Sequence, residues 1–294
     1  MNMKTLTKNR FFRTIGIPFY RMYASSCRNL PAPKVLALSM PKAGTHLLGK
    51  LLGTLPEMMF SGLHLDDNHI FPNADVGDWT EKQFDRRLLL RTAGSCQTGQ
   101  YLTGHFPHTD AVAASLAECE VRPVLILRDP RDVVVSYAHY VSREPRHAHY
   151  RYFNNELKTV DEKVMAAIRG FSKSESVPRG LLSIGRLIED YVPWTLSPGV
   201  TVCSFERLVG SSGGGSDQQQ AAEVQKISEA VNRPLSGEQV TEISQKVFTR
   251  KSRTFRKGQI GDWSNSFTPQ HKEAFKEVAG KQLIELGYEA NFDW

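Results

Sequence analysis

A short apolar run, followed at once by a turn and a second apolar run, most constrains the fold of this chain. Residues 35–38 read Val-Leu-Ala-Leu, which suits a buried strand, and Leu47 and Leu48 begin an apolar helix that continues to Leu55. The turn between them contains Pro41, Lys42 and Gly44. The pattern predicts a strand, a turn large enough to enclose a phosphate group, and a helix. This is the opening unit of an α/β fold.

This turn is a candidate anion-binding site. The first backbone N–H groups of a helix lack intrahelical acceptors and lie at the positive end of the helix dipole. Gly44 lets the backbone approach an anion closely, Thr45 adds a hydroxyl, and Lys42 adds a mobile positive charge. The turn is not a Walker A sequence, because its Lys precedes its Gly, so ATP is not the first ligand it predicts. Taken alone, the turn fits an ordinary solvated loop equally well.

The composition favours one large domain with an anionic partner. A chain of 294 residues with 40% hydrophobic content can bury a full core, and one domain is favoured over two. The formal net charge of +6 favours a nucleotide, a nucleic acid or a membrane surface, without separating them. Four cysteines without metal-ligand spacing predict reduced thiols, no metal site and no disulfide framework. No apolar run reaches about 18 residues, so no transmembrane segment is expected.

Residues 1–33 form a basic arm ahead of the expected domain, residues 34–294. The arm has six Lys or Arg residues and no acidic residue, interleaved with aromatic and aliphatic side chains. Its apolar run is too short and too interrupted for a secretory signal. A packing arm, an organellar transit peptide and a segment in peripheral contact with a membrane all fit this composition. We expect a cytoplasmic protein, with organelle targeting as the alternative.

A second candidate anion site follows another apolar run. Residues 122–127 predict a buried parallel strand, and Arg128 stands at its carboxyl end. Asp129 suits a helix N-cap and Pro130 the first helical position. Ser136 then lies about two turns into this helix and can face the same point as Arg128.

A third candidate anion site lies near the C-terminal end, over residues 254–269. Arg256 and Lys257 are adjacent cations, Gly258 follows them, and Trp263 comes five residues later. A loop of this kind can fold its backbone and its charge over an anion.

The rest of the chain predicts alternating strands and helices. We expect helices over residues 80–92, 110–119, 161–170, 181–194 and 269–286, and strands over 100–105 and 200–205. Residues 57–79 show no clear period, and they fit a mobile loop that walls a pocket and an ordinary surface loop with its own apolar cluster about equally well. Residues 143–152 mix basic and aromatic side chains, for which a pocket wall is favoured over a nucleic-acid surface. The alternation predicts a central parallel β-sheet flanked by helices, with ligands at the carboxyl ends of its strands.

With these three stretches in this order, the sequence closely resembles the sulfotransferases that use 3′-phosphoadenosine 5′-phosphosulfate (PAPS). The resemblance is to the soluble, cytosolic type and its small bacterial-like relatives, and it runs from about Lys34 to the C-terminus. It implies the P-loop NTPase-like sulfotransferase fold, PAPS as donor and 3′-phosphoadenosine 5′-phosphate (PAP) as product. It also implies a small-molecule acceptor rather than a nucleic acid, and no requirement for a metal.

The resemblance also implies which residues bind the nucleotide. The family's 5′-phosphosulfate loop resembles Lys42, Ala43, Gly44, Thr45 and His46. Its 3′-phosphate site resembles Arg128 and Ser136, closed by a C-terminal loop that resembles Arg256, Lys257 and Gly258. Phe205 and Phe248 resemble aromatic residues that lie near the adenine. The family commonly has Thr-Trp where this chain has His46 and Leu47, so the Trp that stacks on adenine is missing here.

The implied reaction is in-line transfer of a sulfuryl group from PAPS to a hydroxyl or amine of the acceptor. The segment around His105 resembles the strand end that presents the family's catalytic histidine, so His105 is the expected general base and His108 the second choice. Lys42 is expected to move from a neighbouring hydroxyl, that of Ser136, to the leaving phosphate as charge develops. A P-loop-like nucleotide kinase and a non-catalytic nucleotide-binding module remain the alternatives.

Overall fold

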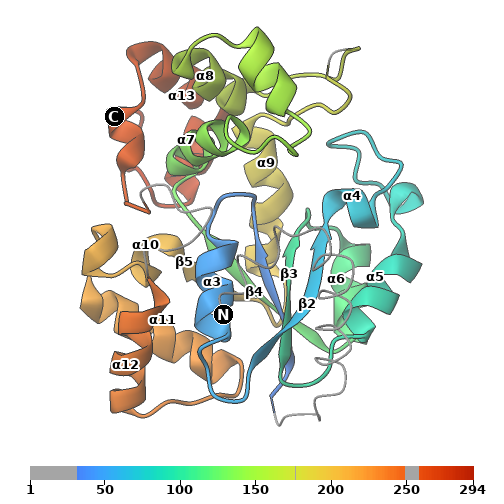
Figure 1. Ribbon diagram of the computed structural model, residues 1–294, viewed down its shortest axis with the longest axis vertical. Coiled ribbons are helices and arrows are strands. Elements are labelled where there is room, and N and C mark those ends of the chain that lie inside the picture. Colours follow the sequence, from blue (N-terminus) through green and yellow to red (C-terminus); the bar gives the residue numbers. More distant parts are fainter. Residues whose placement is uncertain (1–31, 176, 249–257) are drawn as a thin grey trace.

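The computed structural model describes residues 32–175, 177–248 and 258–294 (Figure 1). In this part of the chain, a five-stranded sheet with only parallel pairings forms the centre, in the order β2-β3-β1-β4-β5. The strands are β1 (Lys34–Ser39), β2 (Met59–Asp66), β3 (Gln100–His105), β4 (Val121–Leu127) and β5 (Thr201–Ser204). The predicted central parallel sheet is therefore confirmed.

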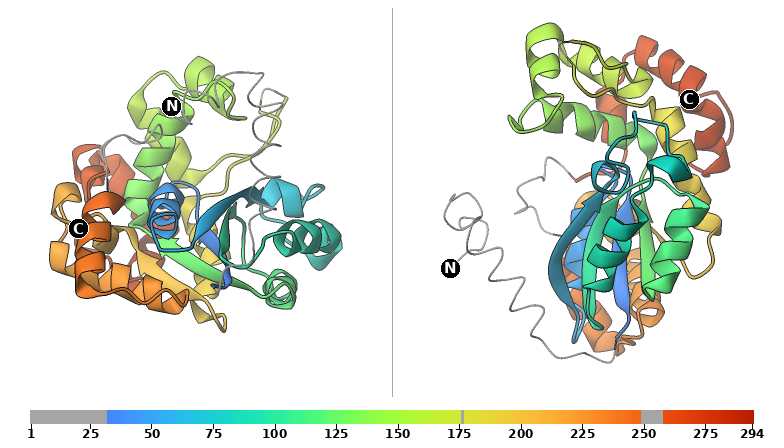
Figure 2. Two further views of the ribbon diagram at one scale, coloured as in Figure 1. Left: turned by 60° about the horizontal axis from the view of Figure 1, so that its bottom comes forward. Right: turned by 90° about the vertical axis from the view of Figure 1, so that its right-hand side faces the viewer.

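Helices cover both faces of this sheet (Figures 1 and 2). One face packs against α3 (Thr45–Leu52), α10 (Phe205–Leu208), α11 (Asp217–Ala230) and α12 (Gly237–Val247). The hydrophobic core on the other face contains side chains of α5 (Arg86–Gly94), α6 (Asp110–Glu118), α7 (Pro130–Val141), α8 (Val160–Arg169), α9 (Ile184–Tyr191) and α13 (Pro269–Glu285). Figure 1 shows α7, α8 and α13 grouped beyond one end of the sheet.

The two faces of β1 explain its continuous apolar sequence. Val35 and Ala37 point into the core with α3 and α11, whereas Leu36 and Leu38 point into the core with α5 and α6. All four side chains are fully buried. Because successive side chains of a strand alternate between faces, a strand covered on both sides is apolar throughout rather than alternating.

Two predictions of secondary structure are wrong. Residues 59–66, expected in a loop, form the edge strand β2, whose register shifts between Phe60 and His64 around the positive-φ residue Gly62. This irregularity breaks the period of two by which a strand is recognised. The helix expected from residue 80 begins at Arg86 instead, with Asp85 as N-cap, and Thr80 precedes only a short 3₁₀ turn.

The other predicted elements are confirmed, with shifts of one to three residues at their ends for most of them. Asp129 is the N-cap of α7 and Pro130 its first residue, as the sequence predicts. The helix predicted over residues 181–194 is α9 followed by a 3₁₀ turn, Val192–Leu196. The remaining helical turns are α4 (Asp67–Ile70), Tyr152–Glu156, Ser211–Gly213 and Asp262–Asn265.

Some expectations from composition fall partly outside the described residues. Nearly all of the basic arm, residues 1–31, lies outside them, as do Arg256 and Lys257. Within the described ranges, no helix is both long enough and apolar enough to span a bilayer. Cys96, Cys119 and Cys203 are buried free thiols.

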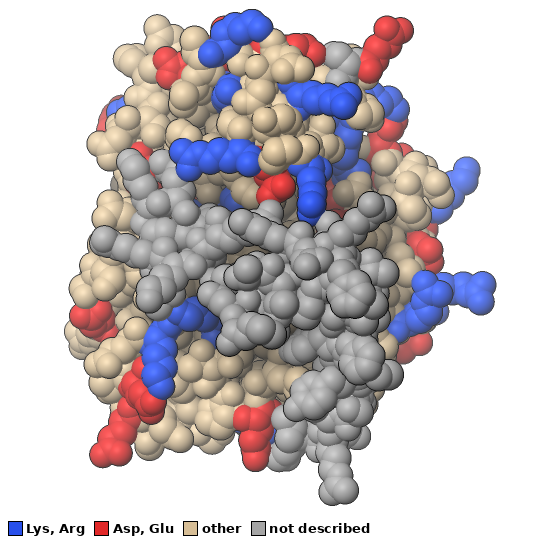
Figure 3. Space-filling view, viewed as in Figure 1, with Lys and Arg blue, Asp and Glu red and all other residues tan. Residues whose placement is uncertain are grey.

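Figure 3 shows Lys and Arg side chains gathered over the upper part of one face, where Figure 1 places α7 and α8.

Candidate active site

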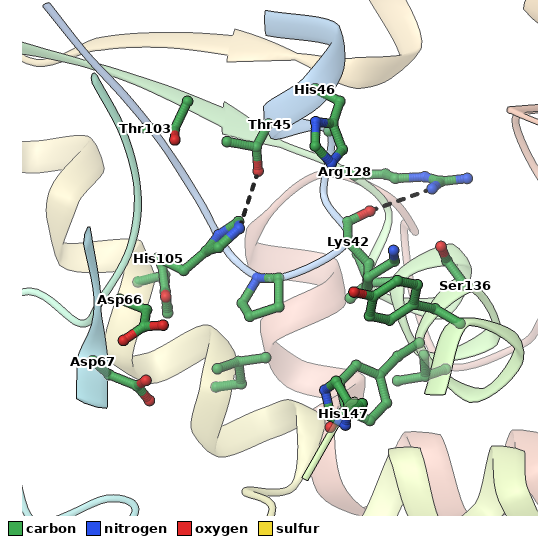
Figure 4. Close-up of a pocket in the computed structure, with 18 of the residues that line it drawn as sticks. Lys42, Thr45, His46, Asp66, Asp67, Thr103, His105, Arg128, Ser136 and His147 are labelled. Carbon is green, nitrogen blue, oxygen red and sulfur yellow. Dashed lines mark hydrogen bonds between the residues drawn. The ribbon is translucent and has the colours of Figure 1, made fainter. Parts of the chain in front are cut away.

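A cavity of about 1210 Å³ lies at the carboxyl ends of the strands (Figure 4). It is lined by residues of the turn after β1, the ends of β2 and β3, the start and middle of α7, and the segments around α10 and residue 258. The predicted site residues that line it are Lys42, Gly44, Thr45, His46, His105, Arg128, Ser136, Phe205, Phe248 and Gly258. Segments far apart in the sequence therefore converge on one space.

The turn after β1 has the geometry of an anion-binding loop. Gly44, the N-cap residue of α3, has a φ of 123°, and a Cβ on it would lie 2.9 Å from Ile126 Cδ1 and 3.0 Å from Phe205 Cδ2. Only glycine fits this position without strain. Because its N-cap residue is a glycine, α3 has no side-chain cap hydrogen bond, an arrangement found where a helix N-terminus receives an anion. Ala43 is turned inward: it is fully buried, and its N–H donates to the Met40 carbonyl at 3.1 Å.

His105 stands at the end of β3 with a defined tautomer. Its Nδ1 lies 2.8 Å from the Ser39 carbonyl oxygen, which can only accept, so Nδ1 carries the proton and donates it. Nε2 therefore has the free electron pair, and it lies 3.5 Å from the Thr45 hydroxyl (Figure 4). Burial lowers the pKa of His105 to about 4. The ring is neutral near pH 7, and Nε2 can accept a proton.

Lys42 reaches the same cavity from the turn. Its backbone φ is 73°, a left-handed conformation that is uncommon for a residue other than glycine. Burial, and then the neighbouring charge of Arg128, lower the pKa of Lys42 to about 8. Its Nζ lies 3.6 Å from the centroid of the Tyr140 ring. Ser136 lies on the same side of the cavity as Lys42 in Figure 4.

Arg128 joins three segments at the end of the cavity beside the turn after β1. Its buried guanidinium lies over the Phe205 ring, 4.1 Å from the centroid. It donates to the backbone carbonyls of Lys42 and Gln259, both at 3.4 Å. The end of β4 thus contacts both the turn after β1 and the C-terminal loop, as the predicted convergence requires.

The second half of the Arg-Asp-Pro-Arg-Asp stretch has a role that the sequence did not reveal. The buried Asp132 carboxylate accepts hydrogen bonds from the N–H groups of Gly261 at 3.0 Å and Trp263 at 2.9 Å. Arg131 pairs with Asp129 at 2.8 Å, and its guanidinium lies 3.9 Å from the centroid of the Trp263 ring. These contacts hold the C-terminal loop beside Arg128.

Polar residues at the far end of the cavity were also missed as individual site residues. His64 lies on β2 with its ring 5.3 Å from that of His105, and its Nδ1 is 2.9 Å from the Thr103 hydroxyl. Asp67 pairs with Arg179 at 2.9 Å, and both line the cavity. Of the two alternatives for residues 57–79, the pocket wall is therefore the one that the structure supports. The irregular register of β2 hid which of them face it.

Two predicted residues are not brought to this cavity. Ala43 lies beneath the turn, and His108 points elsewhere, with Nε2 2.7 Å from the Ser197 hydroxyl and its ring against Trp194 at 4.7 Å. His108 is thus not in a position to serve as the base. No cluster of His, Cys, Asp or Glu among the described residues could hold a metal ion.

The sequence matches the family model for the sulfotransferase domain over residues 32–252 and 222–287. This chain belongs to the sulfotransferase family. Curated relatives include sulfotransferase 6B1 of Danio rerio and of Homo sapiens, each 26% identical, over 211 and 205 residues. These alignments cover 65% and 62% of this chain. They span 62% and 59% of the relatives' own lengths, so this chain matches less than two thirds of each relative.

Solved sulfotransferase structures share this fold. Mouse sulfotransferase SULT7A1, complexed with PAP, superposes with a TM-score of 0.57 at 15% identity and 92% coverage of both chains. Retinol dehydratase, in complex with androsterone and PAP, superposes with a TM-score of 0.54 at 14% identity, over 85% of this chain and 80% of its own. The predicted P-loop NTPase-like sulfotransferase fold is therefore confirmed.

Replacing Asp132 with Ala tests how much the C-terminal loop depends on this carboxylate. We expect Asp132→Ala to lower the free energy of unfolding by about 2 to 3 kcal/mol, because two partly buried N–H groups lose a charged acceptor. Chemical denaturation monitored by tryptophan fluorescence measures the loss. Asp110→Ala, at an exposed position in the first turn of α6, is the control and should change stability by under about 1 kcal/mol. Equal losses in both variants would contradict the role of Asp132.

Proposed function

We propose that this protein transfers a sulfuryl group from PAPS to a hydroxyl or amine of a small-molecule acceptor. The observation that supports this best is that Lys42, His105 and Arg128, from three distant segments, line one cavity. Membership of the sulfotransferase family supports the reaction class. The PAP in the related solved structures supports the donor, and the androsterone and retinol in two of them support a small acceptor.

The residues at one end of the cavity fit such a nucleotide. The close approach that Gly44 permits and the uncapped start of α3 suit the 5′-phosphosulfate, which Lys42, Thr45 and His46 would also contact. Arg128 and Ser136 would hold the 3′-phosphate, together with Gly258 of the C-terminal loop. In our proposal Arg256 and Lys257, outside the described residues, complete this loop, and Phe205 and Phe248 flank the adenine.

His105 and Lys42 would share the chemistry. PAPS supplies an activated sulfuryl group attached to a phosphate leaving group. His105 Nε2 accepts the proton of the acceptor hydroxyl while the acceptor oxygen bonds to sulfur and the bond from sulfur to the phosphate oxygen breaks. The Ser39 carbonyl keeps the Nδ1 proton in place and favours the imidazolium that forms. The Lys42 ammonium meets the negative charge that develops on the leaving oxygen.

The alternatives fit these residues less well. A P-loop-like kinase would need a Mg²⁺-binding Ser or Thr directly after a Walker Lys, whereas here Lys42 precedes Gly44 and Thr45. A non-catalytic nucleotide-binding module would not require a neutral imidazole beside the phosphate loop. His105 has that state and that place.

Titration with three ligands separates these functions. We expect PAP to bind more tightly than ATP or single-stranded DNA in isothermal titration calorimetry. Arg128→Ala should weaken PAP binding by about 10- to 100-fold, because charge-assisted hydrogen bonds to the 3′-phosphate are lost. Arg169→Ala, an exposed residue paired with Glu277, is the matched control and should leave the affinity unchanged. Equal affinities for PAP and ATP would contradict the proposed donor.

Replacing the proposed base separates binding from chemistry. We expect His105→Ala to retain PAP binding and to lose about 10²- to 10⁴-fold in transfer rate, the usual contribution of a general base. Transfer is measured with radiolabelled PAPS and a panel of phenols, alcohols, sugars and amines. His108→Ala is the control and should keep the turnover of the wild type. Unchanged turnover in His105→Ala would remove this residue from the mechanism.

The pH dependence follows from the two lowered pKa values. His105 must be neutral to accept a proton, so activity falls as pH drops through its pKa of about 4. Lys42 must be charged, so activity falls as pH rises through its pKa of about 8. We expect kcat/KM, which reports the free enzyme, to be level between about pH 5 and pH 7. An acid limb near pH 6.5, the ordinary pKa of histidine, would show that a solvated histidine acts instead.

A further inference from the structure

We propose that Tyr140 is a positioning residue that keeps the Lys42 ammonium charged and directed into the cavity before the nucleotide binds. The contact itself is a feature of this structure, whereas its effect on turnover rests on the proposed function. Tyr140 lies in the last turn of α7, four residues after Ser136, and both line the cavity.

The geometry of the contact is that of a cation–π interaction. Lys42 Nζ lies 3.6 Å from the centroid of the Tyr140 ring, well within the range in which the ring quadrupole attracts a cation. The Lys42 ammonium makes no hydrogen bond or ion pair with any residue of the ranges described, so this ring is its main attractive partner there. The left-handed backbone at Lys42 and the rigid helix at Tyr140 bring the two groups together.

The charged and titratable groups around Lys42 make such a partner necessary. Arg128, at the end of β4, disfavours a second cation, and so does burial of the side chain. His46, on α3, and Arg146 and His147, after α7, also line the cavity. The His147 ring lies 5.8 Å from that of Tyr140, and burial lowers its pKa to about 4, so it adds no charge near pH 7. The negative charge of Glu144 acts on His147 and opposes the lowering of its pKa.

A neutral ring suits this role because it does not compete with the substrate. The attraction of an ammonium to a phosphate oxygen in a buried site is stronger than its attraction to a ring face. Tyr140 can thus hold the charge in the free protein and give it up when an anion arrives. A carboxylate in the same place would keep the ammonium and repel the nucleotide.

Chemical labelling tests the proposal without requiring turnover. In the full-length protein, the rate at which acetic anhydride acetylates Lys42, followed by mass spectrometry against pH, gives the pKa of its amine. We expect Tyr140→Leu and Tyr140→Met to lower this pKa by about one pH unit, because a desolvated cation–π contact is lost. Tyr140→Phe keeps the ring and is the matched control, with a pKa within about 0.3 of the wild type.

The alkaline limb of kcat/KM should move with the labelling midpoint in each variant. A wild-type midpoint in the Leu and Met variants would overturn the proposal, as would an equal fall in the Phe variant, which would point to the hydroxyl. Circular dichroism identifies a variant that fails to fold. The Phe and Met variants, which change volume least, then decide. If no acceptor is sulfated by the wild type, the proposed function fails while the labelling result still decides the role of Tyr140.

Discussion

The parallel register of three neighbouring strands is the constraint on which the candidate site depends. β1 pairs with β3 on one side and with β4 on the other, and Leu38 lies opposite both Gly104 and Leu125. The three strands therefore end at the same edge of the sheet. Backbone hydrogen bonds between the strands fix this alignment. Because each strand ends at this edge, the turn with Lys42 and the side chains of His105 and Arg128 lie close together there.

Burial then sets the chemistry of this edge. The same removal from water lowers the pKa of His105 and that of Lys42. For His105, this leaves the imidazole neutral near pH 7. For the lysine it weakens the charge that the proposed reaction needs, and the ring of Tyr140 offsets the loss without adding an anion. Near pH 7, the same cavity therefore holds a neutral imidazole at His105 and a charged ammonium at Lys42.

The two halves of the Arg-Asp-Pro-Arg-Asp stretch have different places in the structure: the first lines the cavity, and the second contacts the C-terminal loop. Arg128 lines the cavity, while Arg131 and Asp132 turn toward the C-terminal loop and hold Trp263 and its neighbours. A buried carboxylate stabilises a loop in this way only where N–H groups meet it with good geometry, since an unpaired charge would be costly there. This end of the cavity is therefore supported by residues that do not line it themselves.

The sequence by itself determined the strands β1, β3, β4 and β5, the turn after β1 and the start of α7, because glycine, proline, N-cap residues and apolar runs act over a few neighbouring residues. It also indicated His105 and Arg128 through the family resemblance. Only the tertiary structure decided that β2 is a strand, that Ala43 and His108 face away from the cavity, and that Asp132 holds the C-terminal loop. It also decided the charge states of His105 and Lys42. Desolvation and contacts across the fold depend on residues tens of positions apart, and no local pattern encodes them.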